Sequence, residues 1–276
     1  MSGEITRFAP SPTGELHLGH ALAAQVAWDG SRRGGGTFLL RLEDIDTTRC
    51  RENYVAMLEE DLRWLGFTWP EPVWRQSRRM EFYAAALERL RGMGLLYPCF
   101  CTRQEIAAAA SAPQGPEGPV YPGTCRHLPE EERTVRILAG SSYAWRLDGE
   151  RAMRKAGVLT WRDRRQGTFT VDLAGLGDVV LARKEVPASY HLAVTVDDAA
   201  QGVTLVTRGG DLLAATHVHR LLQALLDLPV PEWLHHRLIC DGNGRRLAKR
   251  DAARSLRHLR DSAGWSPADV RRAVAG

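Results

Sequence analysis

The chain has 276 residues, of which 44% are hydrophobic and 25% are charged, and its formal net charge is +4. These values are ordinary for a globular chain and exclude a disordered polymer and a fibre, and no apolar run is long enough to cross a bilayer. The N-terminus carries no basic-then-apolar leader, so we expect a cytoplasmic protein with no membrane partner. The small positive charge is compatible with a nucleic-acid partner without requiring one.

Patterns typical of strands and helices alternate in the first hundred residues. Residues 37–42 are nearly all apolar, as in a buried parallel strand, and a Pro- and Gly-containing turn at 10–14 precedes apolar residues at helical spacing. The predicted elements are strands over 5–9 and 37–42 and helices over 16–28, 51–65 and 80–95.

The composition changes at Pro98. Residues 98–130 hold three of the five cysteines and a Pro- and Gly-rich stretch, which predicts a small irregular module, and short β-like runs follow near 142–147, 158–162 and 167–171.

Strand and helix patterns alternate again in the last third of the chain. The predicted elements are strands over 191–196, 203–207 and 233–239, a helix ending near 226, a loop over 242–250 and helices near 252–260 and 267–274. This order predicts an α/β domain formed by residues 1–97 and 187–276, interrupted by an inserted subdomain over 98–186.

The first chemical feature is His17-Leu18-Gly19-His20 at the start of a predicted helix. Free amides and the dipole at a helix N-terminus favour anions, and glycine lets a ligand approach the backbone, so this segment predicts a phosphate site. The alternative is that one histidine caps the helix and the other lies on the surface.

The second feature is the loop 242–250, in which two flexible glycines precede Arg245, Arg246, Lys249 and Arg250. Such a loop can close over a polyphosphate and stabilise leaving pyrophosphate. A solvated basic loop is the alternative, but Lys249 is conspicuous because the chain has only three lysines.

Together these features resemble the two signature motifs of the class I aminoacyl-tRNA synthetases, in the glutamyl branch. The first motif covers residues 7–20, and 40–46, 190–198 and 207–213 are also similar to that branch. The resemblance runs from about residue 5 to about 255. It implies a Rossmann-type class I catalytic domain.

The resemblance implies an ATP site and the residues that serve it. The implied catalytic residues are His17, His20 and Lys249, and the implied ATP-binding residues are Pro10, Gly19, His20, Arg246 and Lys249. The second motif departs from the family because Arg246 replaces a lysine and Ala248 replaces a serine. Arginine keeps the charge, and the lost hydroxyl is expected to slow activation without abolishing it.

A glutamate pocket needs two cationic forks, one carboxylate for the ammonium group and a few neutral donors. The positions that match the family supply Arg7 and Arg208, Glu43, and the hydroxyls of Ser11 and Tyr190. Which arginine takes which carboxylate stays open, and a structural ion pair between Arg7 and Glu43 is the alternative. The implied reaction is attack of the L-glutamate α-carboxylate on the α-phosphate of ATP, with Mg²⁺ on the phosphates.

Cys99, Cys101 and Cys125 supply three thiolates, and a structural zinc site needs four ligands. From spacing alone His127 is the obvious fourth ligand. The family resemblance implies Tyr121 instead, because short glutamyl synthetase relatives bind zinc through three cysteines and one tyrosine. We therefore predict one structural Zn²⁺ on these cysteines and Tyr121, with His127 or three unliganded reduced thiols as alternatives.

The chain stops about 26 residues after the second motif, so we expect no anticodon-binding domain. This pattern is similar to the glutamyl-Q tRNA(Asp) synthetases, which transfer glutamate to queuosine in tRNA(Asp). The partners implied are L-glutamate, ATP and tRNA(Asp) carrying queuosine, and a monomer is expected. A truncated enzyme that charges tRNA(Glu) and a non-catalytic paralogue that binds ATP or RNA are the alternatives.

Overall fold

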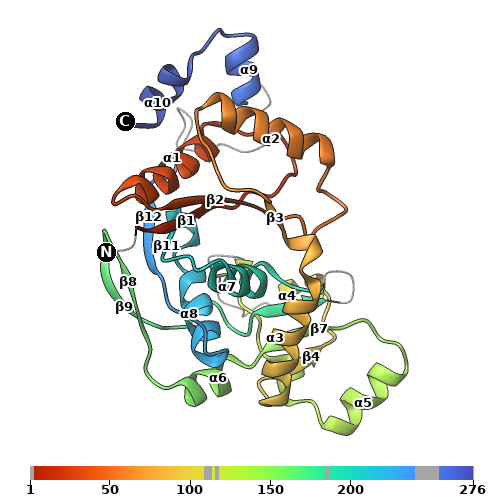
Figure 1. Cartoon of the computed structure of the whole chain (residues 1–276). Helices are drawn as coiled ribbons and strands as arrows, with labels where there is room; N and C mark the ends of the chain where they lie inside the picture. Colours follow the sequence, from red (N-terminus) through yellow and green to blue (C-terminus); the bar gives the residue numbers. More distant parts are fainter. Residues whose placement is uncertain (1–2, 109–113, 116–117, 184–186, 240–254, 276) are drawn as a thin grey trace.

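The computed structural model describes the chain over residues 3–108, 114–115, 118–183, 187–239 and 255–275 (Figure 1). Its strands are β1 (Ile5–Phe8), β2 (Thr37–Leu42), β3 (Trp74–Arg75), β4 (Leu96–Cys99), β5 (Gln114–Gly115), β6 (Gly118–Pro119), β7 (Ala144–Leu147), β8 (Thr160–Asp163), β9 (Gly167–Thr170), β10 (Val180–Arg183), β11 (Leu205–Gly209) and β12 (Glu232–His236). Its α-helices are α1 (Leu18–Arg32), α2 (Glu52–Trp64), α3 (Met80–Gly92), α4 (Arg103–Ala108), α5 (Glu130–Leu138), α6 (Gly149–Ala156), α7 (Tyr190–Ala200), α8 (Ala215–Leu225), α9 (Leu256–Asp261) and α10 (Pro267–Ala275).

A mainly parallel layer of strands joins the two ends of the chain. One sheet has the order β1-β2-β3 and a second has the order β11-β12-β8-β9, in which only β9 runs antiparallel to its neighbour. Strand β1 lies beside β11, since the amide of Thr204 donates to the Ile5 carbonyl at 2.9 Å. The strand order therefore reverses between β1 and β11, which is where doubly wound α/β folds bind ligands.

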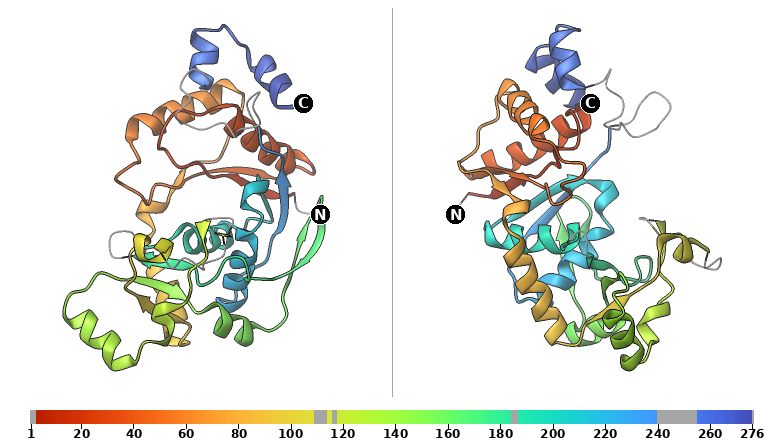
Figure 2. Two further views of the ribbon diagram at one scale, coloured as in Figure 1. Left: turned by 180° about the vertical axis from the view of Figure 1, so that it is seen from behind. Right: turned by 90° about the vertical axis from the view of Figure 1, so that its right-hand side faces the viewer.

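Helices cover both faces of this layer. Helices α1 and α2 lie on one side, with α9 and α10 beyond them, and α7 and α8 lie on the other side (Figures 1 and 2). The apolar core is split in the same way, with Leu22 and Leu58 in one cluster and Leu192 and Leu221 in the other. Apolar side chains are thus removed from water on both faces, as a parallel sheet requires.

Most of the predicted elements are confirmed. Strands predicted over 5–9 and 37–42 are β1 and β2, and the helices predicted over 51–65 and 80–95 are α2 and α3. The loop predicted over 242–250 lies outside the described residues. In the part of the chain that the structure describes, no helix combines the length and apolar character needed to span a membrane.

The strand predicted over 191–196 is wrong, because these residues lie in helix α7. The Ser189 hydroxyl caps the helix by accepting from the Leu192 amide at 3.3 Å, and the Thr195 hydroxyl donates to the His191 carbonyl one turn earlier at 2.7 Å. Residues 191–195 are all buried, so the helix has no polar face in this stretch. A short run that is buried on every side has the same apolar pattern in a helix as in a strand.

Strands from the middle of the chain form a separate antiparallel sheet. Strands β10, β7 and β4 pair antiparallel in that order, while helix α5 lies at an outer edge of the molecule (Figure 1). The β8–β9 hairpin instead extends the main layer, because Asp163 of β8 pairs with Trp233 of β12. The subdomain boundaries at 98 and 186 stay a prediction.

Candidate active site

A cavity of about 320 Å³ opens at the carboxyl ends of β1 and β11, where the strand order reverses. Its lining includes all the residues predicted for glutamate and the first-motif residues predicted for ATP binding and catalysis: Arg7, Pro10, Ser11, His17, Gly19, His20, Glu43, Tyr190 and Arg208. Asp211, His236 and Arg237 also line it and were not predicted. Arg246 and Lys249 lie outside the described residues.

The two histidines of the first motif form the N-terminal cap of α1. The Gly19 amide donates to Nδ1 of His17 at 3.0 Å, and the His17 amide donates to Nδ1 of His20 at 3.1 Å. Since each Nδ1 is an acceptor, the proton of each neutral ring is on Nε2. Capping therefore places two imidazole rings that carry their protons on Nε2 beside the helix N-terminus, where anions are favoured.

Gly19 is required by the position of the His17 ring. A Cβ atom at Gly19 would lie 2.9 Å from Cε1 and 3.0 Å from Nδ1 of His17. Any side chain at this position would therefore push the imidazole out of its capping position.

Arg7 is buried and paired with a carboxylate of the protein. Its Nε donates to Oδ1 of Asp198 at 2.9 Å and its Nη1 donates to the Thr207 carbonyl at 3.1 Å. Nη1 of the fully buried Arg41 lies 2.8 Å from the same Asp198 oxygen. Burial by itself would raise the pKa of Asp198, but the charges of Arg7 and Arg41 lower it. Among the described residues, Asp198 rather than Glu43 is the ion-pair partner of Arg7.

Glu43 follows β2 and reaches the cavity next to these charges. Its Oε1 lies 3.6 Å from Nη2 of Arg41. Burial raises the pKa of Glu43 to about 7, against the opposing effect of Arg41 and Arg7. A carboxylate with this pKa can neutralise an ammonium group when it is ionised.

Arg208 at the end of β11 is also buried, but its partners are neutral. Its Nη1 donates to the Tyr190 hydroxyl at 3.3 Å and contacts Nδ1 of His219 at 3.0 Å, and its Nε donates to Nε2 of His235 at 3.2 Å. Nη2 donates to the hydroxyl of Thr216. No carboxylate among the described residues lies within 4.0 Å of this guanidinium, so its charge is available to an anionic ligand.

Three supporting residues, Asp198, His219 and His235, were missing from the predicted site. Asp198 stands in a stretch that was recognised as typical of the family, but a strand over 191–196 gave no reason to orient it toward Arg7. His235 faces Arg208 across the β11–β12 pair, so it could be found only from the strand register. His219 comes from α8 and carries no local signal.

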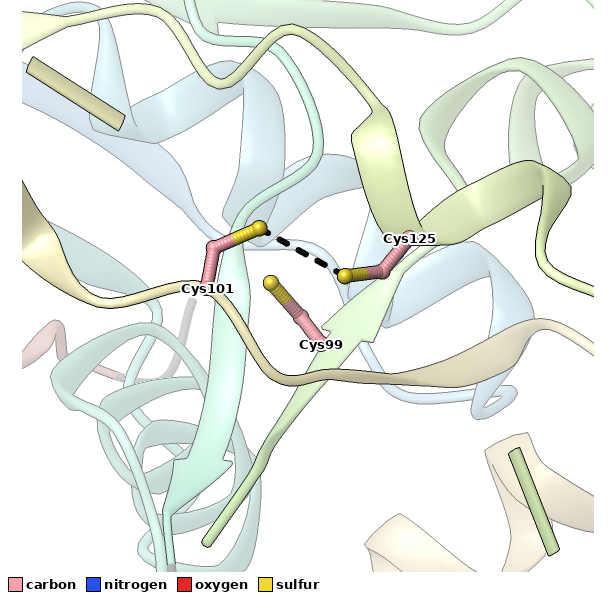
Figure 3. A group of neighbouring side chains, drawn as sticks. All are labelled: Cys99, Cys101 and Cys125. Carbon is pink, nitrogen blue, oxygen red and sulfur yellow. Dashed lines mark hydrogen bonds between the residues drawn. The ribbon is translucent and has the colours of Figure 1, made fainter. Parts of the chain in front are cut away.

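The three clustered cysteines converge, and their sulfur atoms point toward one another (Figure 3). Sγ of Cys99, Cys101 and Cys125 all lie within 4.8 Å of one another. The buried Tyr121 places its hydroxyl 3.8 Å from Sγ of Cys101 and 2.7 Å from the amide nitrogen of Cys125. His127 is exposed and does not belong to this group. Three thiols and a phenol at this separation fit a tetrahedral ion such as zinc.

Comparison with known proteins identifies the family. A family model described as tRNA synthetases class I (E and Q), catalytic domain, matches residues 5–274. The chain belongs to this class I tRNA synthetase family. It is therefore a ligase, and the resemblance derived from the motifs is confirmed.

Relatives within this synthetase family are similar over nearly the whole chain. A glutamyl-Q tRNA(Asp) synthetase from Rhodobacter capsulatus is 52% identical over 98% of this chain and 99% of its own length. One from Symbiobacterium thermophilum is 44% identical over 96% of this chain and 83% of its own length. A solved glutamate tRNA ligase from Elizabethkingia meningosepticum, in complex with its amino acid, has a TM-score of 0.73 and 29% identity over 91% of this chain. The chain spans about half, 53%, of that ligase.

Proposed function

We propose that this synthetase activates L-glutamate with ATP to form glutamyl-adenylate and transfers the glutamate to the queuosine base of tRNA(Asp). The contrast between the two arginines carries the glutamate part of the proposal, and the names of the relatives support the queuosine of tRNA(Asp) as acceptor. Arg7 is ion-paired with Asp198, whereas the buried Arg208 has only neutral partners among the described residues. A cationic fork without a protein carboxylate, in the same cavity as a second fork and Glu43, suits a dicarboxylic amino acid.

Selectivity for glutamate over glutamine follows from the same groups. The amide of glutamine cannot neutralise Arg208, and it would leave buried donors unpaired. Glu43 supplies the negative charge for the α-ammonium group, and the hydroxyls of Ser11 and Tyr190 add neutral hydrogen-bonding groups at the cavity wall.

Activation needs positioning and charge stabilisation rather than a general base. The glutamate α-carboxylate is already an anion when it attacks the α-phosphate of ATP, and pyrophosphate leaves with Mg²⁺. The Nε2–H groups of His17 and His20 donate to the phosphates as negative charge moves toward the leaving group. Pro10 and Gly19 let the nucleotide approach the backbone, and Arg246 and Lys249 take the family's second-motif role.

The cysteine cluster is proposed to hold one structural zinc ion through Cys99, Cys101, Cys125 and Tyr121. The ion would join β4 to the Thr124–His127 turn, within an inserted subdomain over 98–186. Its contribution is stability and shape, since four protein ligands leave no open position for substrate. The enzyme is further proposed to act as a cytoplasmic monomer.

Transfer of radiolabelled glutamate tests the acceptor. The enzyme is incubated with ATP and tRNA(Asp) that carries or lacks queuosine, and with tRNA(Glu). Removal of the 3′-terminal adenosine from each tRNA separates a base acceptor from a 3′-end ester. We expect label only on queuosine-containing tRNA(Asp), with or without its terminal adenosine. Label on intact tRNA(Glu) alone would support the truncated glutamyl-tRNA synthetase instead.

Glutamate-dependent exchange of pyrophosphate into ATP tests the first half-reaction without any tRNA. Exchange that depends on glutamate but not on glutamine supports activation by this cavity. No exchange under any condition, with ATP still bound, would favour the non-catalytic paralogue.

A further inference from the structure

A chain of buried polar side chains connects Asp163 of β8 to the Arg208 guanidinium. Oδ2 of Asp163 lies 2.8 Å from Nδ1 of His235 and also accepts from the His235 amide at 2.9 Å. Nε2 of His235 then lies 3.2 Å from Nε of Arg208. The side chains of Asp163 and His235 are both fully buried. No bound substrate is needed to hold this chain together.

The carboxylate decides which nitrogen of His235 carries the proton. A carboxylate only accepts, so Nδ1 of His235 is the protonated nitrogen and Nε2 presents a lone pair. That lone pair accepts from Nε of Arg208 and also lies 3.2 Å from the Thr216 hydroxyl, which itself accepts from Nη2 of Arg208. The opposite tautomer would direct an N–H group at the N–H of the guanidinium.

The environment keeps Asp163 ionised and His235 neutral. Burial would raise the pKa of Asp163, but hydrogen bonds from His235 and from the amides of Arg165 and Gln166 lower it below its usual value. Burial lowers the pKa of His235 to about 4, and the charge of Arg208 acts in the same direction. An ionised Asp163 and a neutral His235 are the protonation states that the bonds from Nδ1 of His235 to Asp163 and from Nε of Arg208 to His235 require.

A second imidazole contact acts on the other edge of Arg208. Nδ1 of His219 lies 3.0 Å from Nη1 of Arg208, and Nε2 of His219 lies 3.2 Å from Nδ1 of His191. Since Nδ1 accepts from the guanidinium, the His219 proton is on Nε2 and faces His191. Two imidazole lone pairs thus hold Arg208 without neutralising its charge.

We propose that Asp163 and His235 are positioning residues for substrate recognition. The Asp163 carboxylate sets the tautomer of His235, and Nε2 of the neutral His235 ring then orients the charged Arg208 guanidinium toward a substrate carboxylate. This inference rests on the proposed function, since it assumes that Arg208 receives a carboxylate of glutamate. A protein carboxylate in place of His235 would orient the fork equally well but would compete with the substrate. A neutral imidazole avoids that competition.

The position of Asp163 explains why this role falls to a residue outside β11 and β12. Its other oxygen, Oδ1, accepts from the amides of Arg165 and Gln166 at 2.8 and 2.9 Å, which closes the β8–β9 turn. The carboxylate therefore has four donors and a single orientation. The β8–β9 hairpin in this way fixes the side chain that contacts His235, which in turn contacts the cavity-lining Arg208.

Asp163→Asn tests the tautomer directly. Its amide would place an N–H₂ group against His235 or against the turn, and the ring can then take the Nε2–H tautomer. We expect the KM for glutamate in pyrophosphate exchange to rise about tenfold, the cost of one buried hydrogen bond replaced by opposed donors, with the KM for ATP unchanged within about twofold. ¹⁵N spectra of histidine-labelled full-length enzyme should show the His235 proton on Nδ1 in the wild type and on Nε2 in Asp163→Asn.

Matched variants separate positioning from simple loss of stability. Asp148→Asn removes a carboxylate that caps α6 by accepting from the Arg151 amide at 2.9 Å, without any histidine contact among the described residues, and should leave both KM values unchanged. His235→Leu removes the acceptor and should raise the glutamate KM, whereas His235→Gln can return an amide oxygen to Arg208 and should recover most of the loss.

The outcomes are distinguishable from failure of the proposed function. Wild-type enzyme that shows no glutamate-dependent exchange would refute the function. Wild-type exchange combined with an unchanged glutamate KM in an Asp163→Asn enzyme whose His235 carries its proton on Nε2 would refute the positioning role. A higher glutamate KM with His235 still protonated on Nδ1 would also refute it, because KM would then change without the tautomer. If both stay unchanged, His235→Leu decides, since a glutamate KM unchanged in that variant refutes the role. A parallel rise in both KM values with a lower melting temperature would also refute it, because that pattern indicates a structural role alone.

Discussion

A methyl group on Gly19 is expected to disturb catalysis far more than folding. The Cβ of Gly19→Ala would lie 2.9 Å from Cε1 of His17, about half an ångström inside ordinary carbon contact. The His17 ring has to move, and movement lengthens the bond of 3.0 Å that its Nδ1 accepts from the Gly19 amide. The same shift carries Nε2–H away from its place at the cavity.

The two consequences differ in size. A lost N-cap bond costs about 1 kcal/mol, and alanine in place of helical glycine returns up to about 1 kcal/mol, so the change in unfolding free energy is expected to be within about 1 kcal/mol. That corresponds to a shift of about 2–4 °C in melting temperature for a chain of this size. Removal of one preorganised donor costs roughly a hundredfold in rate, so we expect displacement of this one to slow exchange at least about tenfold.

Thermal unfolding and pyrophosphate exchange measure the two effects side by side. Gly92→Ala is the matched control, because Gly92 ends helix α3 and a Cβ there meets nothing within 4 Å. The control should keep its activity and unfold at the same or a slightly higher temperature. If Gly19→Ala exchanged pyrophosphate at the wild-type rate, the assignment of His17 as a phosphate donor would be refuted.

Three further predictions concern other parts of the molecule. Because the pKa of Glu43 is about 7, its ionised fraction falls about tenfold from about pH 8 to about pH 6. The glutamate KM should therefore rise by up to that factor over this range. Glu43→Gln should raise the glutamate KM at every pH and remove most of its dependence on pH. Arg208→Lys keeps the charge but loses the fork, so the glutamate KM should rise by roughly a hundredfold, about 3 kcal/mol, with little change in the ATP KM. Cys125→Ser should reduce zinc from about one ion to below about 0.2 per chain in elemental analysis, together with a lower melting temperature, whereas an equal zinc content in both proteins would contradict the metal site.

Local sequence patterns predicted the secondary structure correctly wherever an element had one apolar face or was bounded by a Gly- or Pro-containing turn. β1, β2 and the helices that follow them have such signals, and the first motif lies between a strand and a helix as its glycine and proline residues indicate. Helix α7 lacks these signals because residues 191–195 are buried on all sides, so periodicity could not separate helix from strand. Its helical structure depends on packing against the rest of the protein, which a short stretch of sequence does not reveal.

The same helix explains why the two arginines could not be told apart in the sequence. In a helix, residues seven apart lie on one face, so His191 and Asp198 share one face of α7. Asp198 is ion-paired with Arg7 at 2.9 Å, whereas His191 contacts His219, which in turn contacts Arg208. One helix face therefore supplies a charged partner to one fork and a neutral support to the other. In an extended strand, residues 191 and 198 would lie on opposite faces, and this division of roles would not exist.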